Sequence, residues 1–173
     1  GVEKIVHPSN YWFNVPNYYD ITEWPFVHKP KKPKIGYFGR ICQIKGLDIF
    51  IEISKTFNLV EFVMCGQGDP EPFLKQGSDT GNLKYKPPIH GKERGEFLSE
   101  LTALVTPSIY IEPFCGVNVE AQLCGVPVIS NDFGAFIETL EQFKTGLRFH
   151  TLADFGSGVQ MALDRQFDRA YVH

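Results

Sequence analysis

Two glutamates, Glu112 and Glu120, stand in the mostly apolar stretch IEPFCGVNVEAQLCGVPVIS at 111–130, which contains no lysine or arginine. An unpaired carboxylate costs free energy when it is buried, so each glutamate needs a group to hold. Carboxylates accept hydrogen bonds from the hydroxyls of a sugar as well as from cations. The other interpretation is that Glu112 lies in solvent and that Glu120 pairs with a distant lysine.

The loop between the two glutamates is suited to an anion. Cys115, Gly116 and Val117 lead into a predicted helix over 117–124, which Gly125 ends at the position where helices favour a left-handed residue. The first N–H groups of a helix have no partner inside it, and together they add roughly half a positive charge. An anion bound at this loop needs no metal.

A second loop carries two cations. Gly39 lets the chain turn after an apolar run, and Arg40 and Lys45 bracket the short segment that follows. Two cations on one loop suit a diphosphate, because each charge-assisted hydrogen bond contributes about 1.5–3 kcal/mol. Taken alone, this loop is equally compatible with two ordinary surface cations.

Apolar runs alternate with helical patterns along the chain. The runs predict strands near 35–38, 60–65, 83–88, 103–106 and 127–130, with helices following most of them. Continuous apolar strands that alternate with helices indicate an α/β fold, a Rossmann-like doubly wound parallel sheet in a single domain. Ligands of such sheets bind outside the carboxyl ends of the strands, which is where both loops fall.

The composition excludes several classes of protein. The 173 residues are 43% hydrophobic and 21% charged with a net charge of −3, so we expect a globular domain with no affinity for nucleic acid. Four cysteines without a CxxC pair argue against zinc and favour a reducing, cytoplasmic setting. No apolar run approaches the roughly 20 residues of a membrane span, so membrane association is not expected.

The two ends of the sequence differ from its middle. Residues 1–32 are rich in aromatic residues and proline without periodic order, and we expect an interdomain connector arm. The basic run 28–34 in this region indicates a solvated linker, or else a basic docking patch. We expect the main, ligand-binding domain over 33–165 and a truncated tail over 166–173.

The motifs occur in the order found in one family. Together they resemble the donor-binding C-terminal half of retaining glycosyltransferases of the GT-B fold, family four, over about residues 34–150. The residues that carry the resemblance are Gly39-Arg40-x4-Lys45-Gly46, Cys65-Gly66-Gln67-Gly68, Thr106-Pro107-Ser108 and Glu112-x7-Glu120-Ala121-x3-Gly125-x-Pro127-Val128.

The resemblance implies a role for each residue of the two loops. Arg40 and Lys45, after Gly39, would bind the diphosphate of the donor, and Glu112 would contact the transferred sugar. Glu120 would hold the ribose hydroxyls. The family usually shows Glu-x-Phe-Gly, whereas Cys115 precedes the glycine in this sequence.

Two further groups of residues would complete the site by the same resemblance. The amides of Cys115, Gly116 and Val117 would meet sugar hydroxyls and phosphate. The nucleobase would lie between two segments from other loops, Gly66-Gln67 and Ile89-His90.

The implied reaction is transfer of a hexose from a nucleoside diphosphate sugar to an acceptor. No Asp-x-Asp motif is present to hold a metal, so we expect no cofactor and expect the cations to take its place. In the family the acceptor site belongs to a preceding N-terminal domain, so this chain is expected to bind donor without transferring sugar alone.

Two other functions fit less well. A non-catalytic nucleotide-binding or scaffold domain would have the same sheet. A dinucleotide-dependent oxidoreductase would need a glycine fingerprint after the first strand, and Gly39-Arg40-Ile41 does not supply it. Ser108 lies among the same loops but has no partnering acid and base, which argues against a hydrolytic triad.

Overall fold

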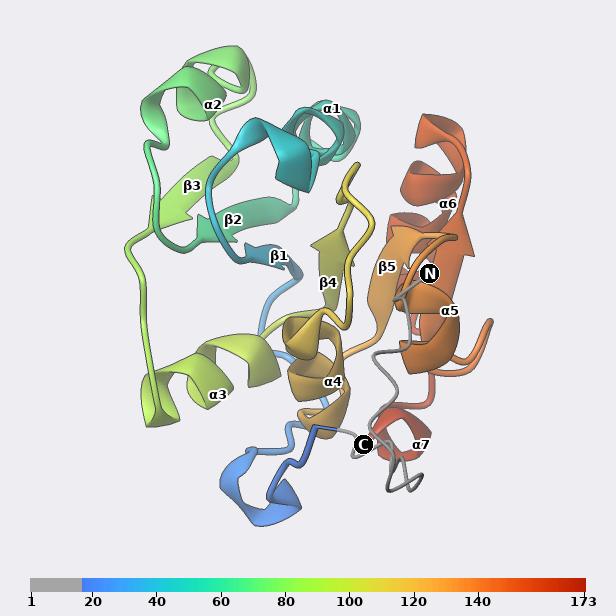
Figure 1. Cartoon of the computed structure of the whole chain (residues 1–173). Helices are drawn as coiled ribbons and strands as arrows, with labels where there is room; N and C mark the ends of the chain where they lie inside the picture. Colours follow the sequence, from blue (N-terminus) through green and yellow to red (C-terminus); the bar gives the residue numbers. More distant parts are fainter. Residues whose placement is uncertain (1–16) are drawn as a thin grey trace, which may run out of the picture.

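The structure, a computed structural model, describes residues 17–173 and contains one six-stranded parallel sheet (Figure 1). The strands lie in the order β3-β2-β1-β4-β5-β6. Their bounds are β1 Lys34–Phe38, β2 Glu61–Cys65, β3 Leu83–Lys86, β4 Ala103–Thr106, β5 Val128–Asn131 and β6 Gly146–Phe149. The predicted Rossmann-like α/β fold is confirmed.

Helices cover both faces of the sheet (Figure 1). They are α1 Leu47–Thr56, α2 Glu71–Gln76, α3 Lys92–Ser99, α4 Gly116–Leu123, α5 Phe136–Thr139, α6 Leu152–Leu163 and α7 Arg169–Val172, with the 3-10 turns η1 Ile21–Glu23 and η2 Gln43–Lys45. The central strands are mostly apolar because alternate residues face opposite sides of a sheet that is covered on both faces. In β2, for example, Phe62 and Met64 join the core under α1 and α6, while Val63 and Cys65 join the core under α3 and α4. The edge strand β3, with the sequence LKYK, alternates apolar and charged residues.

The strand order reverses between β1 and β4, which are neighbours in the centre of the sheet. From β1 the chain moves outward through β2 to β3, then returns to β4 and continues outward on the other side. The loops that leave β1 and β4 therefore diverge and leave a space at their carboxyl ends, where α/β sheets bind ligands. The η2 segment and the loop before α4 are these two loops.

Helix boundaries follow local signals in the sequence. Gly125 has φ 69° just after α4, which confirms the predicted left-handed end of that helix. Thr151 and Asp154 form a capping box at the start of α6, as the sequence predicts. The strand β6 and the short helices α2, α5 and α7 were not predicted.

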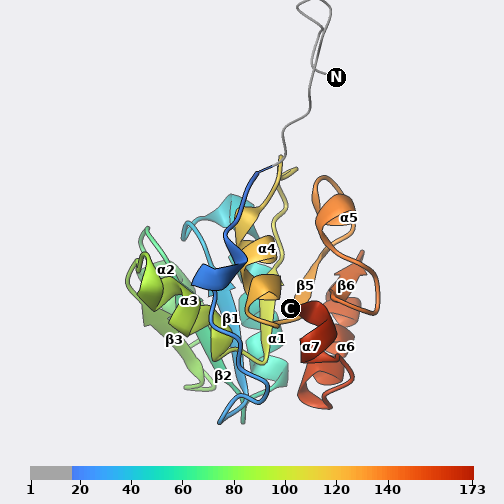
Figure 2. The ribbon, with the colours of Figure 1, turned by 90° about the horizontal axis from the view of Figure 1, so that it is seen from below.

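The described part of the connector arm packs on the domain. Figure 2 shows this segment, in blue, crossing α3 and α4. Pro25 lies against Gly95 of α3, and the Arg169 guanidinium donates to the Val27 carbonyl at 2.8 Å. Residues 1–16 of the predicted arm lie outside the described residues, and the division of the chain at 33 and 166 stays a prediction.

Candidate functional site

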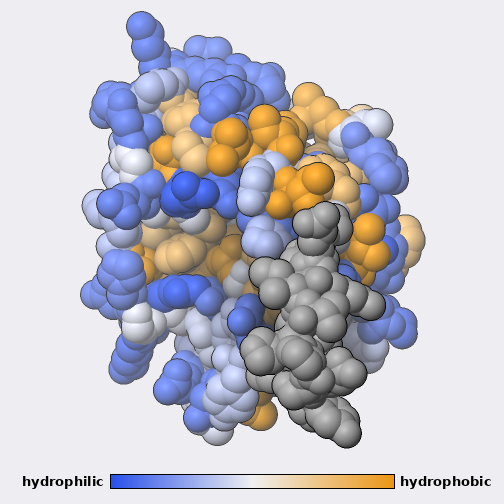
Figure 3. All heavy atoms as spheres, viewed as in Figure 1, coloured by the Kyte–Doolittle hydropathy of each residue, from blue (hydrophilic) through white to orange (hydrophobic). Residues whose placement is uncertain are grey.

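A cavity of about 450 Å³ lies at the carboxyl ends of β1, β2 and β4. Figure 3 shows it as a hollow with an apolar floor between hydrophilic residues. Eleven of the twelve residues that the sequence predicts for the site line it: Gly39, Arg40, Lys45, Gly66, Gln67, Ile89, His90, Glu112, Cys115, Gly116 and Val117. The twelfth, Glu120, is buried and contacts another lining residue, Arg94.

The loops after β1 and β2 pack backbone against backbone. The Gly39 amide donates to the Cys65 carbonyl at 2.9 Å, and Gly66 has φ 148°. A Cβ on Gly66 would lie 1.7 Å from the Gly39 carbonyl oxygen, so only glycine fits there. This contact brings Arg40 and Gln67 to the same cavity.

Glu112 is paired, which corrects the expectation of a carboxylate without a cation. The Lys45 Nζ lies 2.5 Å from the Glu112 Oε1, and the Ser108 hydroxyl donates to the same oxygen at 2.6 Å. The side chains of Lys45 and Glu112 are 15% and 8% exposed, so neither charge is fully solvated. The interpretation that Glu112 lies in solvent is wrong.

Glu120 is also paired, with an arginine from another helix. The Arg94 Nη2 of α3 contacts the Glu120 Oε2, and the glutamate side chain is 7% exposed. Burial raises the pKa of the Glu120 carboxyl, and the Arg94 guanidinium opposes this shift. The alternative interpretation, that Glu120 pairs with a distant lysine, was therefore correct in expecting a distant cation. The cation is an arginine and not a lysine.

Arg94 was not predicted from the sequence to be a residue of the site. It belongs to a helix whose apolar positions define only the face toward the sheet, and nothing in the residue spacing connects it to α4. The only available signal was its position just after the Ile89-His90 loop.

The start of α4 is open. Cys115 precedes the helix in the left-handed conformation, with φ 60° and ψ 66°, and no side chain caps the helix. Within residues 17–173, the amides of Cys115, Gly116 and Val117 donate no hydrogen bond. Three free amides at a helix start can bind an anion. Cys115 occupies the position where the family pattern Glu-x-Phe-Gly has glycine, and it adopts the left-handed conformation that glycine adopts most easily.

The Cys115 thiol should be unreactive. Burial and the Glu112 carboxylate raise its pKa to about 12, so the thiol stays protonated at pH 8. We expect iodoacetamide to alkylate Cys115 at pH 8 at least ~1000-fold more slowly than free cysteine, because only the thiolate reacts. Mass spectrometry of the labelled peptide measures the rate, and a rate close to that of free cysteine would contradict the expectation.

Arg40 is the more solvent-exposed cation of the cavity. Its side chain forms no ion pair with any residue from 17 to 173. Its carbonyl accepts a hydrogen bond from the Tyr37 hydroxyl at 2.6 Å, which fixes the backbone of the loop. The charge of Arg40 is therefore available to a ligand.

The other end of the cavity is less charged. Ile89 is buried while His90 and Gln67 are exposed, and Phe38 from β1 also lines the cavity. The apolar side chains can pack against the face of a flat ring such as a nucleobase, and the polar side chains can form hydrogen bonds with its edge. In the described part of the chain, no three His, Cys, Asp or Glu side chains are grouped to hold a metal ion. Over the same residues, no helix could cross a bilayer.

The chain belongs to a known family. The family model of glycosyl transferases group 1 matches residues 20–163, and the predicted membership of the GT-B C-terminal domains is confirmed. An uncharacterized 41.2 kDa protein in the cps region of Klebsiella pneumoniae is 30% identical over 117 residues, which cover 68% of this chain and 32% of that protein. The capsular polysaccharide biosynthesis glycosyltransferase CapM of Staphylococcus aureus is 31% identical over 121 residues, covering 65% and 31%. The chain thus spans about a third of the length of these relatives.

Solved structures share the fold. A variant of S. aureus TarM, solved with UDP, has a TM-score of 0.78 at 22% identity, covering 92% of this chain and 34% of that chain. The C-terminal domain of the group 1 family protein LpcC from Francisella tularensis has a TM-score of 0.75 at 20% identity, covering 90% and 92%.

Proposed function

We propose that this chain is the nucleotide-sugar donor-binding domain of a retaining, metal-independent glycosyltransferase that transfers a hexose. One observation carries the proposal. Arg40, Lys45, Glu112 and the free amides at the start of α4 all line one cavity. This set offers two cations and a helix start to a diphosphate, with a carboxylate beside them for a sugar hydroxyl.

Cleavage of the bond between the sugar and the diphosphate builds negative charge on the leaving diphosphate and positive charge on the sugar. Arg40, Lys45 and the α4 amides would stabilise the diphosphate where its charge develops. Lys45 can serve both ends of the donor, because an ammonium has three donors and Glu112 takes only one of them. These groups would do the work for which other transferases use a metal.

The acceptor site lies outside this chain in the proposal. The chain covers about a third of its curated relatives, and the remaining length can hold an acceptor-binding domain. The chain would then bind the donor without transferring sugar by itself. Its four free cysteines are consistent with a place in the cytoplasm.

A titration of UDP and GDP into wild type and Arg40→Ala tests the proposal. We expect one of the nucleotides to bind, and we expect Arg40→Ala to weaken its binding about tenfold or more through the loss of charge-assisted hydrogen bonds. Lys75→Ala is the matched control, because it removes a cation from the exposed side of α2, away from the cavity. Equal weak binding by wild type and Arg40→Ala would instead favour the non-catalytic scaffold domain.

A further inference from the structure

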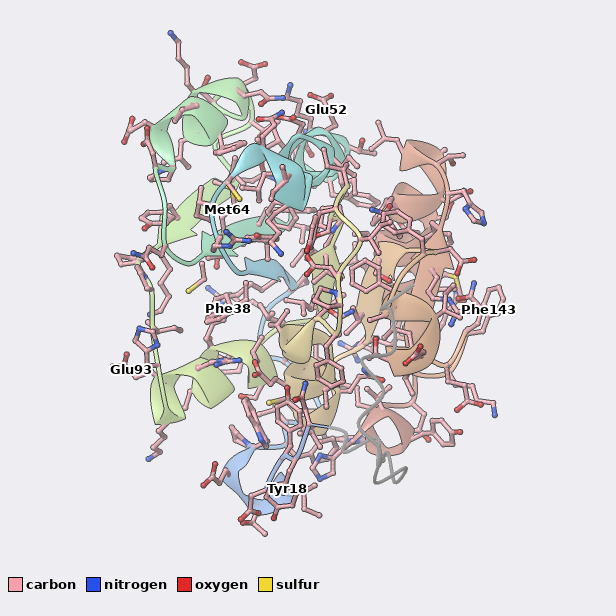
Figure 4. The ribbon with its side chains drawn as sticks, viewed as in Figure 1. Tyr18, Phe38, Glu52, Met64, Glu93 and Phe143 are labelled. Atoms are coloured by element: carbon pink, nitrogen blue, oxygen red, sulfur yellow. The ribbon has the colours of Figure 1, made fainter. Side chains whose placement is uncertain are left out.

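The ion pair between Arg94 and Glu120 is held from two sides. The Arg94 guanidinium carbon lies 5.2 Å from the centre of the Phe38 ring and 5.9 Å from the centre of the Trp24 ring. Phe38 ends β1, beside α3 (Figure 4). Trp24 directly follows η1 in the predicted connector arm. The neighbouring Glu93 points away from the cavity at the outer side of α3 (Figure 4). Two aromatic rings therefore fix the guanidinium at the cavity wall.

Arg94 occupies only one of the two oxygens of Glu120. It contacts Oε2, which is buried and makes this ion pair without a well-aligned hydrogen bond, and no residue from 17 to 173 donates a hydrogen bond to Oε1. Oε1 lies 3.7 Å from the point that a Cβ on Gly116 would occupy, and Gly116 lines the cavity. One oxygen is thus free to accept a hydrogen bond at the cavity floor.

Two further polar groups lie close to Glu120. The Tyr19 hydroxyl lies 2.6 Å from the same Cβ point of Gly116, and burial together with the Glu120 carboxylate raises its pKa, so it stays a hydroxyl. The Arg94 Nε is buried without a hydrogen-bond partner in the described part of the chain.

We propose that Arg94 is a positioning residue that orients Glu120, so that the free Oε1 selects nucleoside diphosphates with intact ribose hydroxyls. Trp24 supports Arg94, so the connector arm contributes to this selectivity. The inference rests on the proposed function, because it concerns the nucleotide in the same cavity. It goes further by assigning the ribose preference to an arginine of α3 and to a residue of the arm.

The experiment compares each ribonucleotide with its deoxy forms. UDP and GDP are titrated into the wild-type chain beside their 2′-deoxy and 3′-deoxy counterparts. We expect the ribonucleotide that binds to be preferred over at least one deoxy form by about tenfold or more, as is typical of hydrogen bonds to a charged group. In Arg94→Met this preference should fall below about threefold, with the affinity for the deoxy form nearly unchanged.

Further variants separate positioning from folding. Arg94→Met leaves the Glu120 carboxylate without its partner, so the double variant Arg94→Met/Glu120→Gln provides a chain without an unpaired charge at this site. We expect it to show the same low preference as Glu120→Gln alone, because Arg94 acts through Glu120. Trp24→Ala should lower the preference in part. Lys92→Met is the matched control, since Lys92 is an exposed cation on the same helix and should leave the preference unchanged.

Each outcome decides the inference. A wild-type preference that persists in Arg94→Met, or losses that add in the double variant, would overturn it. Binding without any preference for ribose in wild type would overturn it while leaving the proposed function intact. If neither UDP nor GDP binds to wild type, both the proposed function and this inference are rejected.

Discussion

Replacement of Lys45 by methionine is expected to weaken nucleotide binding about 10- to 100-fold and to destabilise the domain by about 3 kcal/mol. The loss of affinity follows from the loss of one of the two cations, Arg40 and Lys45, that the loop after β1 brings to the cavity. The loss of stability has a separate cause, because the variant removes the ammonium that lies 2.5 Å from the Glu112 carboxylate, which is only 8% exposed.

The double variant Lys45→Met/Glu112→Gln separates the two effects. It carries no charge at position 45 or 112, and the Ser108 hydroxyl can still donate to the amide oxygen at position 112. We expect its free energy of unfolding to return to within about 1 kcal/mol of wild type while nucleotide binding stays weak. Urea denaturation and calorimetric titration measure the two quantities.

An exposed ion pair provides the control for Lys45. Lys55 and Glu52 lie one turn apart on α1, with side chains 30% and 44% exposed. Lys55→Met should leave the free energy of unfolding nearly unchanged, as is typical of surface pairs. If Lys45→Met proves as stable as wild type and binds UDP and GDP equally well, the ion pair has neither of the roles given to it.

Replacement of Gly46 by alanine is expected to destabilise the domain by about 3 kcal/mol or more, among the larger effects of single substitutions. Gly46 has φ 69°, and its Cβ would lie 1.9 Å from the Pro107 carbonyl oxygen. A backbone atom cannot move aside as a side chain can, so the η2 loop or the loop after β4 must shift. Since these loops carry Lys45 and Glu112, nucleotide affinity should fall as well.

Gly81 is a matched control for Gly46. Its φ is 68°, but nothing lies within 4 Å of its Cβ position. Gly81→Ala therefore has the same backbone strain, about 1–2 kcal/mol, without the clash. Urea denaturation of both variants measures how much stability the clash with Pro107 costs beyond the backbone strain. Equal losses of stability in the two variants would mean that the loops move apart without cost and would contradict the prediction.

The sheet and the edge that carries the site could be predicted from the sequence. A strand covered on both faces is apolar at every position, as in Phe62 to Cys65, and such a run is visible without a structure. Parallel strands place all their carboxyl ends at one edge, so loops distant in the sequence could be assigned to one site. The strand β6 was missed because Gly146 and Arg148 interrupt its apolar pattern and two of its four residues are only partly buried.

The partners of the two glutamates could not be predicted. Lys45 and Glu112 are 67 residues apart, and Arg94 reaches Glu120 from another helix. Periodicity describes which face of an element is buried, but it contains no information on which side chains of different elements meet. The sequence therefore suggested two carboxylates without cations, whereas folding gives each of them one.

The sequence by itself determined the kind of chemistry and the edge of the sheet where it occurs, because residue types, glycine turns and strand ends are local properties. Only the tertiary structure decided how the charges are shared, since ion pairing depends on distances between segments far apart along the chain. In the folded domain Arg40 is left open to a ligand, Lys45 is engaged by Glu112, and Glu120 is joined to an arginine that no local pattern connects to it.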